Sequence, residues 1–168
     1  AFMIRRSVFE ELGGFDEDLF LVYEDVDLSY RAQLRGYLCL YVPAACVRHA
    51  GSATIGAVSR VSIFYGQRNL EWVYFKNSPA WILLRTLPWH VIYSLAGGLS
   101  LIPAGLFGVW CSAKWDALKG LPRVLRKRRT VQRSRRTDPR RIWALMSRSW
   151  LMLKWREKRF DRGTLAAR

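Results

Sequence analysis

Residues 20–42 read FLVYEDVDLSYRAQLRGYLCLYV, and this stretch decides the predicted fold. Apolar residues at positions 28, 32 and 34, the pair Asp27/Arg31 four residues apart, and Gly36 beyond them predict a short helix over residues 26–35. Residues 37–42 are an unbroken run of aromatic, aliphatic and cysteine residues that Pro43 ends, which predicts a strand buried on both faces. A short helix followed by a buried strand is typical of an α/β domain.

The residues before this stretch fit the same pattern. Residues 2–4 predict the end of a buried strand, and residues 7–12 predict a short helix with Ser7 as its N-cap. Glu10 follows Ser7 at the spacing of a capping box, and Gly13 and Gly14 end the helix. Strands alternate with helices, so the sequence predicts an α/β fold.

Charge divides the chain into two parts. Residues 1–78 contain eight Lys/Arg and nine Asp/Glu, a net charge of −1, whereas residues 79–168 contain twenty and four, a net charge of +16. The first residues, AFMIRR, lack an initiator Met and a signal-peptide pattern, so we expect position 1 to be internal to a longer protein. The three cysteines form no C-x-x-C motif, which favours a reducing, cytosolic setting.

A long apolar segment follows the first part. Residues 86–113 contain no Asp, Glu, Lys or Arg, and about 20 apolar residues are enough to cross a bilayer. Prolines, glycines and a histidine interrupt the run. Three interpretations stay open: a segment that enters the membrane, as one span or as a re-entrant or oblique pair of helices; a segment that lies in the membrane interface; and buried protein core. The first is favoured by tryptophans near the ends of the segment, at positions 81, 89, 110 and 115.

A basic run lies next to the apolar segment. Residues 123–141 contain ten Lys/Arg, each attracted to anionic lipid by about 1 kcal/mol, and such runs lie on the cytoplasmic side of membranes. The alternatives are a solvated tail and a nucleic-acid contact, but no recognition helix, RNA-binding motif or zinc module accompanies the run, so no nucleic acid is expected as partner. Residues 140–160 fit an amphipathic helix at a membrane interface.

The acidic cluster at residues 24–27 is the first candidate for chemistry. Asp25 and Asp27 form a D-x-D pattern, but residues two apart on a helix point about 200° away from each other and cannot easily hold one metal ion. Asp27 is explained as a helix acid paired with Arg31. For Asp25, two interpretations stay open: an N-cap, or a carboxylate that faces a cleft.

Residues 1–54 carry a series of motifs: I-R-R at 4–6, G-G-F-D-E at 13–17, F-x-x-Y-E-D-x-D-L at 20–28, R-x-x-x-x-G-Y at 31–37 and V-P-x-A-x-V-x-H at 42–49. In this order they resemble the C-terminal part of the catalytic domain of family 2 glycosyltransferases, particularly the bacterial rhamnosyltransferase-like members. Residues 67–70 depart from the Q-x-x-R-W motif of the processive synthases in that family. This departure favours transfer of a single sugar over polymerisation.

The resemblance implies a GT-A fold, a Rossmann-like sandwich that binds a nucleotide-diphosphate sugar and a lipid-linked or cell-envelope glycan acceptor. It implies an inverting transferase with Asp25 as the general base and Glu24 as its support. By the same resemblance the substrate-binding residues are Arg5, Gly14, Phe15, Asp16 and Arg68.

The resemblance also implies a divalent metal, Mg or Mn, with His49 as one ligand. Most of the other ligands would lie in the nucleotide-binding half, which the family carries before position 1. We therefore expect residues 1–168 alone to be inactive and unable to bind the donor normally.

The predicted organisation has three parts: an acceptor-side catalytic part at 1–78, a hydrophobic membrane-associated segment at 79–118, and a basic amphipathic tail at 119–168. The predicted enzyme works on the cytoplasmic face of the cell membrane, next to an anionic lipid surface. The alternative is a non-enzymatic scaffolding module at the membrane surface, in which the acidic cluster only begins a helix and the polybasic tail binds lipid.

Overall fold

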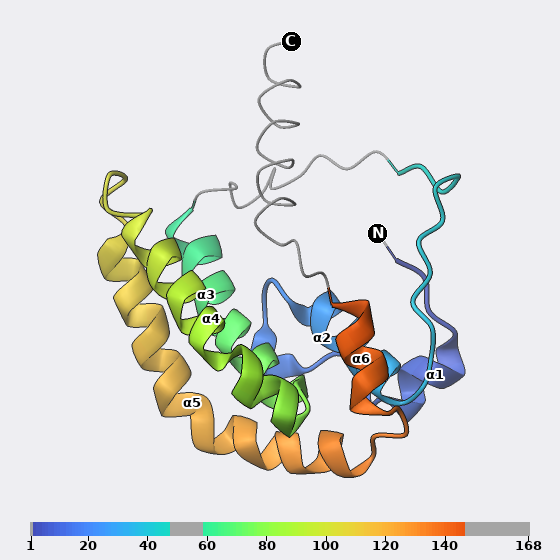
Figure 1. The fold of residues 1–168 in the computed structure, drawn as a ribbon. Helices are drawn as coiled ribbons and strands as arrows, with labels where there is room; N and C mark the ends of the chain where they lie inside the picture. The colour runs from blue at the N-terminus through green and yellow to red at the C-terminus, as the bar shows by residue number, and fades with distance from the viewer. Residues whose placement is uncertain (1, 48–58, 147–168) are drawn as a thin grey trace. The chain divides into compact units, whose positions relative to one another are not determined.

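The computed structural model describes residues 2–47 and 59–146, and every regular element within these ranges is a helix. The chain forms two compact units, residues 1–137 and 138–168. In chain order the helices, shown in Figure 1, are α1 (Arg6–Glu11), the 3-10 helix η1 (Glu17–Leu19), α2 (Glu24–Leu34), α3 (Arg60–Asn77), α4 (Ala80–Leu99), α5 (Phe107–Arg133) and α6 (Pro139–Leu145). The helix α6 belongs to the second unit, and the other helices belong to the first.

The prediction of an α/β fold is wrong for the part of the chain that the structure describes. Neither residues 2–4 nor residues 37–42 form a strand. Leu38, Leu40 and Tyr41 are 68%, 78% and 89% exposed rather than buried on both faces. A strand satisfies its backbone N–H and C=O groups only by pairing with a second strand, and neither described range offers one. The apolar run therefore stays irregular.

The short helices of the first unit lie close to where the sequence predicts them. The helix α1 begins at Arg6, so Ser7 lies within it and does not cap it. Gly13 and Gly14 follow with φ of +76° and +70°, a left-handed conformation that glycine adopts without strain. The helix α2 begins at Glu24, and Gly36 follows its C-cap with φ of +96°. The sequence pattern thus located these helix ends to within a few residues.

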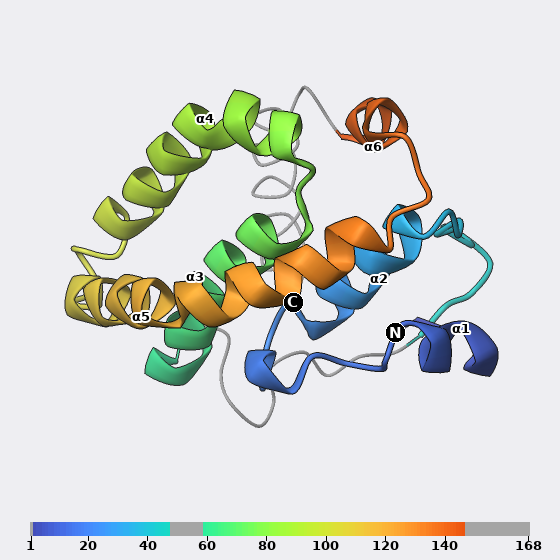
Figure 2. The ribbon, with the colours of Figure 1, turned by 90° about the horizontal axis from the view of Figure 1, so that it is seen from below.

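The core of the first unit lies between α3 and α5, which are in extensive contact; in Figure 2 the ribbon of α5 passes across that of α3. The indole N–H of Trp72 donates a hydrogen bond of 3.0 Å to the carbonyl of Ala117. A Cβ at position 120 would lie 2.4 Å from the Trp72 ring, so glycine is needed there for the two helices to approach. Burial of this cluster stabilises the helix pair; its members are Leu19, Trp72, Val73, Ala117 and Val124.

The apolar segment forms α4 and the start of α5, joined by residues 100–106. This arrangement corrects the prediction of a membrane helix. Among the described helices, none combines the length and the apolar character needed to cross a bilayer. Gly98 of α4 lies against the ring of Trp110, where a Cβ would be 2.6 Å from the ring. The predicted boundary between residues 118 and 119 falls within α5, and the three-part organisation stays a prediction.

Candidate functional site

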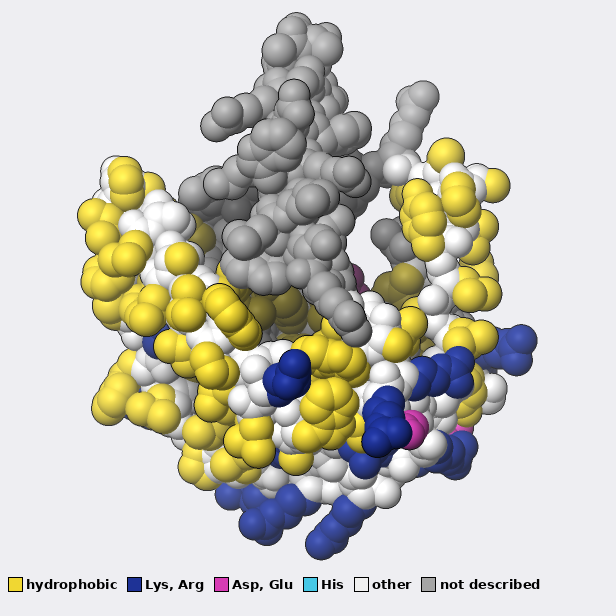
Figure 3. Space-filling model, in the orientation of Figure 1, with side chains coloured by type: hydrophobic (Ala, Val, Ile, Leu, Met, Phe, Trp, Pro, Cys, Tyr) yellow, Lys and Arg dark blue, Asp and Glu magenta, His cyan; other side chains and the backbone are white. Residues whose placement is uncertain are grey.

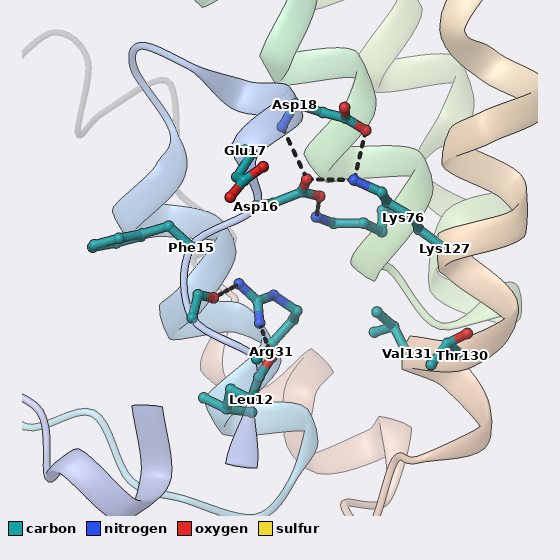
Figure 4. Close-up of a pocket in the computed structure, with 12 residues that line it drawn as sticks. Leu12, Phe15, Asp16, Glu17, Asp18, Arg31, Lys76, Lys127, Thr130 and Val131 are labelled. Carbon is teal, nitrogen blue, oxygen red and sulfur yellow. Dashed lines mark hydrogen bonds and ion pairs between the residues drawn. The ribbon is translucent and has the colours of Figure 1, made fainter. Parts of the chain in front are cut away.

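A pocket of about 460 Å³ opens beside the turn that follows α1. Three predicted substrate-binding residues, Gly14, Phe15 and Asp16, line it, and Figure 4 shows how its side chains lie. The opposite wall comes from α3 and α5. The lining residues are Leu12, Gly13, Gly14, Phe15, Asp16, Glu17, Asp18, Arg31, Lys76, Lys127, Thr130 and Val131.

A series of ion pairs, in which acidic and basic side chains alternate, lies along this pocket. The Lys127 Nζ atom lies 2.5 Å from Asp18 Oδ2 and 2.5 Å from Asp16 Oδ1. Lys76 forms an ion pair with Asp16 and lies 2.7 Å from Asp27 Oδ1.

The series ends on α2, where Arg31 Nε donates to Asp27 Oδ2 at 2.8 Å. The predicted Asp27/Arg31 pair is thus confirmed. The other two donor nitrogens of Arg31 bond the carbonyls of Leu12 and Gly14, at 2.6 and 2.8 Å. These contacts tie the turn after α1 to α2, and the ion pairs tie both to α3 and α5.

The Asp16 carboxyl is strongly acidic in this setting. Burial alone would raise its pKa, but the ammonium groups of Lys76 and Lys127 lower the pKa from 3.8 to about 2. The carboxylate is therefore ionised at neutral pH and contributes stability there. A shift of this size corresponds to about 2 kcal/mol of folding free energy.

This shift predicts acid sensitivity. The stabilisation is complete above pH 3.8, the ordinary pKa of the carboxyl, and is lost as the pH falls towards 2, because the unfolded state then binds the proton first. We expect Lys127→Met to weaken this dependence, measured as the midpoint of thermal unfolding against pH. Lys119→Met is the matched control, because Lys119 contacts the Trp115 ring and lies outside the pocket. An unchanged acid dependence in Lys127→Met would count against the role given to this pair.

The pocket does not fit a divalent metal ion. Within residues 2–47 and 59–146, no group of three His, Cys, Asp or Glu side chains is placed to hold one. The carboxylates of Asp16 and Asp18 already face ammonium groups. His49, the predicted metal ligand, lies outside the described residues, so its role stays a prediction.

Asp25 and Glu24, the predicted catalytic pair, lie in the first turn of α2. The N-cap of this helix is Tyr23, not Asp25. Asp25 is exposed, and its Oδ1 atom accepts a hydrogen bond of 2.7 Å from the N–H of Val26. Glu24 Oε2 is buried and has no hydrogen-bond partner among the described residues. The carboxylate of Asp25 is thus held by its own helix and remains accessible.

The two aspartates of the D-x-D pattern have different surroundings. Asp27 is fully buried among Arg31, Lys76 and Asn77, whereas Asp25 is exposed. The carboxylate of Asp27 makes bonds to all three of these side chains. Asp27 therefore serves the fold, and in this arrangement the pair does not form a common ligand site.

The loop before Glu24 has an unusual backbone. Phe20, Val22 and Tyr23 have φ of 51°, 65° and 74°, values that cost a residue with a side chain about 1 kcal/mol or more each. The fully buried Asn69 of α3 holds this loop. Its Nδ2 atom donates to the carbonyls of Leu19, Leu21 and Val22 at 2.6 to 2.8 Å. Asn69 thereby fixes the segment that leads into Glu24 and Asp25.

Arg68 lies next to Asn69 and away from the pocket lining. Its Nε atom donates to Asn69 Oδ1 at 3.0 Å, and Nη2 donates to the carbonyl of Asp18 at 2.8 Å. The guanidinium lies 4.1 Å from the centre of the Trp72 ring, a favourable cation–π distance. The predicted substrate-binding role of Arg68 stays a prediction, and its observed contacts orient Asn69.

The structure brings some predicted site residues together and leaves others apart. Gly14, Phe15 and Asp16 share the pocket, and Asp25, Glu24 and Arg68 lie outside its lining. Arg5 is exposed at the N-cap of α1 and does not line it either. The predicted roles of these residues in substrate binding and catalysis stay predictions.

Sequence reasoning assigned no role to three residues of this region: Asn69, Lys76 and Lys127. Asn69 and Lys76 contact residues about 50 to 60 positions earlier in the chain, and Lys127 contacts Asp16, 111 positions earlier. In the sequence, Lys127 is one of ten positive charges in the basic run at residues 123–141. No local pattern distinguishes it from its neighbours, so the pairing became visible only in the fold.

Comparison with protein families gives a match over most of the chain. The family model described as "Glycosyl transferase family group 2" matches residues 1–155. No solved structure matches the chain.

Comparison with curated proteins finds two relatives that carry the same description, N-acetylglucosaminyl-diphospho-decaprenol L-rhamnosyltransferase. They come from Mycobacterium tuberculosis strains CDC 1551 / Oshkosh and ATCC 25618 / H37Rv. Each is 46% identical to this chain over 54 residues, which make up 32% of this chain and 18% of the relative. The chain thus matches less than a fifth of the length of these relatives.

Proposed function

This chain belongs to glycosyl transferase family group 2, and on that premise we propose that it is part of an inverting glycosyltransferase. The enzyme transfers a single sugar from a nucleotide-diphosphate sugar to a lipid-linked or cell-envelope glycan acceptor. The observation that supports this most directly is the accessible Asp25 carboxylate in the first turn of α2, within the Glu24-Asp25 motif.

Asp25 acts as the general base of the transfer. Its carboxylate removes the proton from the acceptor hydroxyl as that oxygen attacks the anomeric carbon of the donor sugar. The bond between the anomeric carbon and the diphosphate oxygen breaks, and the nucleoside diphosphate leaves with the electron pair. Attack opposite the leaving group inverts the anomeric centre, and Asp25 ends the step protonated. Glu24 lies beside it and supports its position.

The acceptor lies near the pocket formed by Gly14, Phe15 and Asp16. Phe15 is 43% exposed and packs edge-on against Phe9, with the ring centres 5.4 Å apart. It therefore offers a fixed aromatic face, against which a sugar ring can stack. No group of the described residues is placed to hold a metal ion, and the divalent metal with ligands before position 1 stays a prediction.

A lipid-linked acceptor is supported by the description of the relatives, which names a diphospho-decaprenol carrier. We place the enzyme on the cytoplasmic face of the cell membrane. The net charge of +16 over residues 79–168 supports this location, because Lys and Arg near an anionic membrane surface contribute about 1 kcal/mol each to binding.

The experiment is a transfer assay with the longer protein that contains this chain. The donor is nucleotide-diphosphate L-rhamnose and the acceptor is N-acetylglucosaminyl-diphospho-polyprenol. We expect a lipid-linked disaccharide, detected by mass spectrometry, with one nucleoside diphosphate released per transfer. If a panel of nucleotide sugars yields neither product nor released nucleotide while the protein still binds lipid, the non-enzymatic scaffold is the better account.

A further inference from the structure

The inner face of α4, which packs against α3, carries a row of polar side chains. Thr86, His90 and Ser94 follow one another at intervals of four residues and therefore lie on one side of the helix. His90 Nε2 lies 2.7 Å from Glu71 Oε2, and the Ser94 hydroxyl donates to Glu71 Oε1 at 3.1 Å. The hydroxyl groups of Thr86 and Tyr74 are 2.9 Å apart. These hydrogen bonds and the stacked rings of Tyr74 and His90 thus link α4 to α3.

The carboxylate of Glu71 stays ionised within this contact because a cation pairs with it. Lys114 of α5 places its Nζ atom 2.5 Å from Glu71 Oε1. Burial alone would raise the pKa of the Glu71 carboxyl, but the bonds from His90 and Lys114 lower it from 4.5 to about 2. Glu71 is therefore ionised at neutral pH. The helices α3, α4 and α5 enclose a bonded ionic group where most helix interfaces enclose apolar side chains.

The opposite face of α4 is exposed and, apart from Arg85 near its start, apolar. We define the outer face of α4 by its most exposed large side chains on that side. No Asp, Glu, Lys or Arg occurs between positions 85 and 114. Figure 3 shows hydrophobic side chains gathered over this helix. The members of the outer face and their exposed fractions are Leu84 (70%), Trp89 (63%), Ile92 (55%), Leu95 (51%) and Leu99 (59%).

This distribution is the reverse of that found in a helix at a water interface, where polar residues face the solvent and apolar residues the core. Polar side chains turned inward and apolar side chains turned outward are typical of helices whose outer side contacts lipid. Because the inner face is held by α3 and α5, only the outer face is open to such a contact. A flat contact of this kind buries the exposed leucines and the isoleucine without crossing the bilayer.

The charge of the neighbouring helix favours a lipid over another protein copy. The helix α5 carries exposed Lys119, Arg126, Arg129 and Arg133, and dark-blue side chains lie along the lower edge of Figure 3 over this helix. The whole chain has a net charge of +15. Two copies therefore repel each other, whereas a surface rich in anionic headgroups attracts this charge.

We propose that the outer face of α4 docks on the surface of an anionic lipid bilayer, with the helix lying in the plane of the interface and the positive charge of the chain favouring anionic headgroups. The choice of a lipid surface as the partner rests on the proposed function. The test of this inference measures vesicle binding without sugar transfer, so the two proposals can fail separately.

The test is cosedimentation of the 168-residue chain with vesicles of phosphatidylcholine that contain phosphatidylglycerol, compared with vesicles of phosphatidylcholine alone. We expect binding to the anionic vesicles and much weaker binding to the neutral ones. The double variant Ile92→Gln/Leu95→Gln is expected to lower the partition coefficient about tenfold or more. The matched control, Leu38→Gln/Leu40→Gln, changes two exposed leucines outside α4 and is expected to bind as the unchanged chain does.

Circular dichroism of both double variants checks that they fold. The single variant Leu95→Gln repeats the test with a smaller change, and we expect it to bind vesicles at an intermediate level. Equal vesicle binding by the α4 variant and the unchanged chain would overturn the proposal. So would a concentration-dependent dimer in sedimentation velocity that the α4 variant abolishes, because the outer face would then join two copies of the chain.

Discussion

Asp27→Asn is expected to lower the free energy of unfolding by about 3 to 5 kcal/mol, the usual cost of breaking a buried ion pair. The Asp27 carboxylate is fully buried. It accepts a hydrogen bond of 2.8 Å from Arg31 Nε and lies 2.7 Å from Lys76 Nζ. The amide that replaces it carries no charge, so these two buried cations lose an anion that they share. Urea denaturation of the 168-residue chain, followed by circular dichroism, measures the effect.

Asp25→Asn is the matched control for this prediction, because it makes the same chemical change two residues earlier. Asp25 is exposed and bonds only the N–H of Val26 among the contacts that the structure describes for it. Asparagine keeps an oxygen that can accept this bond, so the free energy of unfolding should stay within about 0.5 kcal/mol of the wild-type value. Equal stability of both variants would show that the ion pairs of Asp27 do not hold the fold.

The contrast between these two aspartates was largely predictable from the sequence. Helix geometry places residues two apart on different sides, and the four-residue spacing to Arg31 favours an ion pair for Asp27. Both features depend on local spacing, which a sequence displays directly. The glycines at 13, 14 and 36 marked helix ends for the same reason.

The predicted strands failed because strand formation depends on a partner elsewhere in the chain. Residues 37–42 have the composition of a buried strand, yet Leu40 is 78% exposed and the described residues contain no neighbouring strand. Asn69 shows the same limit at the site. Its amide meets carbonyls 47 to 50 positions away, and nothing in the residues around it indicates this contact.

Composition alone also could not predict which side of α4 carries the polar side chains. The sequence shows an uncharged segment and predicts that the membrane is near. Only the fold shows that Thr86, His90 and Ser94 all face α3, because the position of Glu71 decides which side of the helix is buried. The segment thus includes α4, which has a row of polar side chains on its inner face and mostly apolar side chains on its outer face.

Asp25→Asn is expected to lower the rate of sugar transfer by about 10² to 10⁴, the usual contribution of a general base. The substitution keeps the size of the side chain and its bond to Val26 N–H, but removes the group that takes the acceptor proton. The measurement is the initial rate of product formation by the longer protein that contains this chain, with donor and acceptor in excess.

Glu10→Gln is the control for this rate. Glu10 is an exposed acid that pairs with Arg6 on the surface of α1, and exposed pairs of this kind contribute little to stability. Its rate should match that of the unchanged enzyme. A comparable fall in rate for Glu10→Gln would trace the loss at Asp25 to a general charge effect.

The central claim is that the carboxylate of Asp25 takes the acceptor proton, and chemical rescue tests it most directly. Asp25→Ala removes the base and leaves space at the start of α2, where added formate can supply a carboxylate. We predict that formate restores part of the transfer rate of Asp25→Ala, in proportion to its concentration, and does not raise the rate of the unchanged enzyme. Transfer by Asp25→Ala at close to the wild-type rate without formate would contradict the claim.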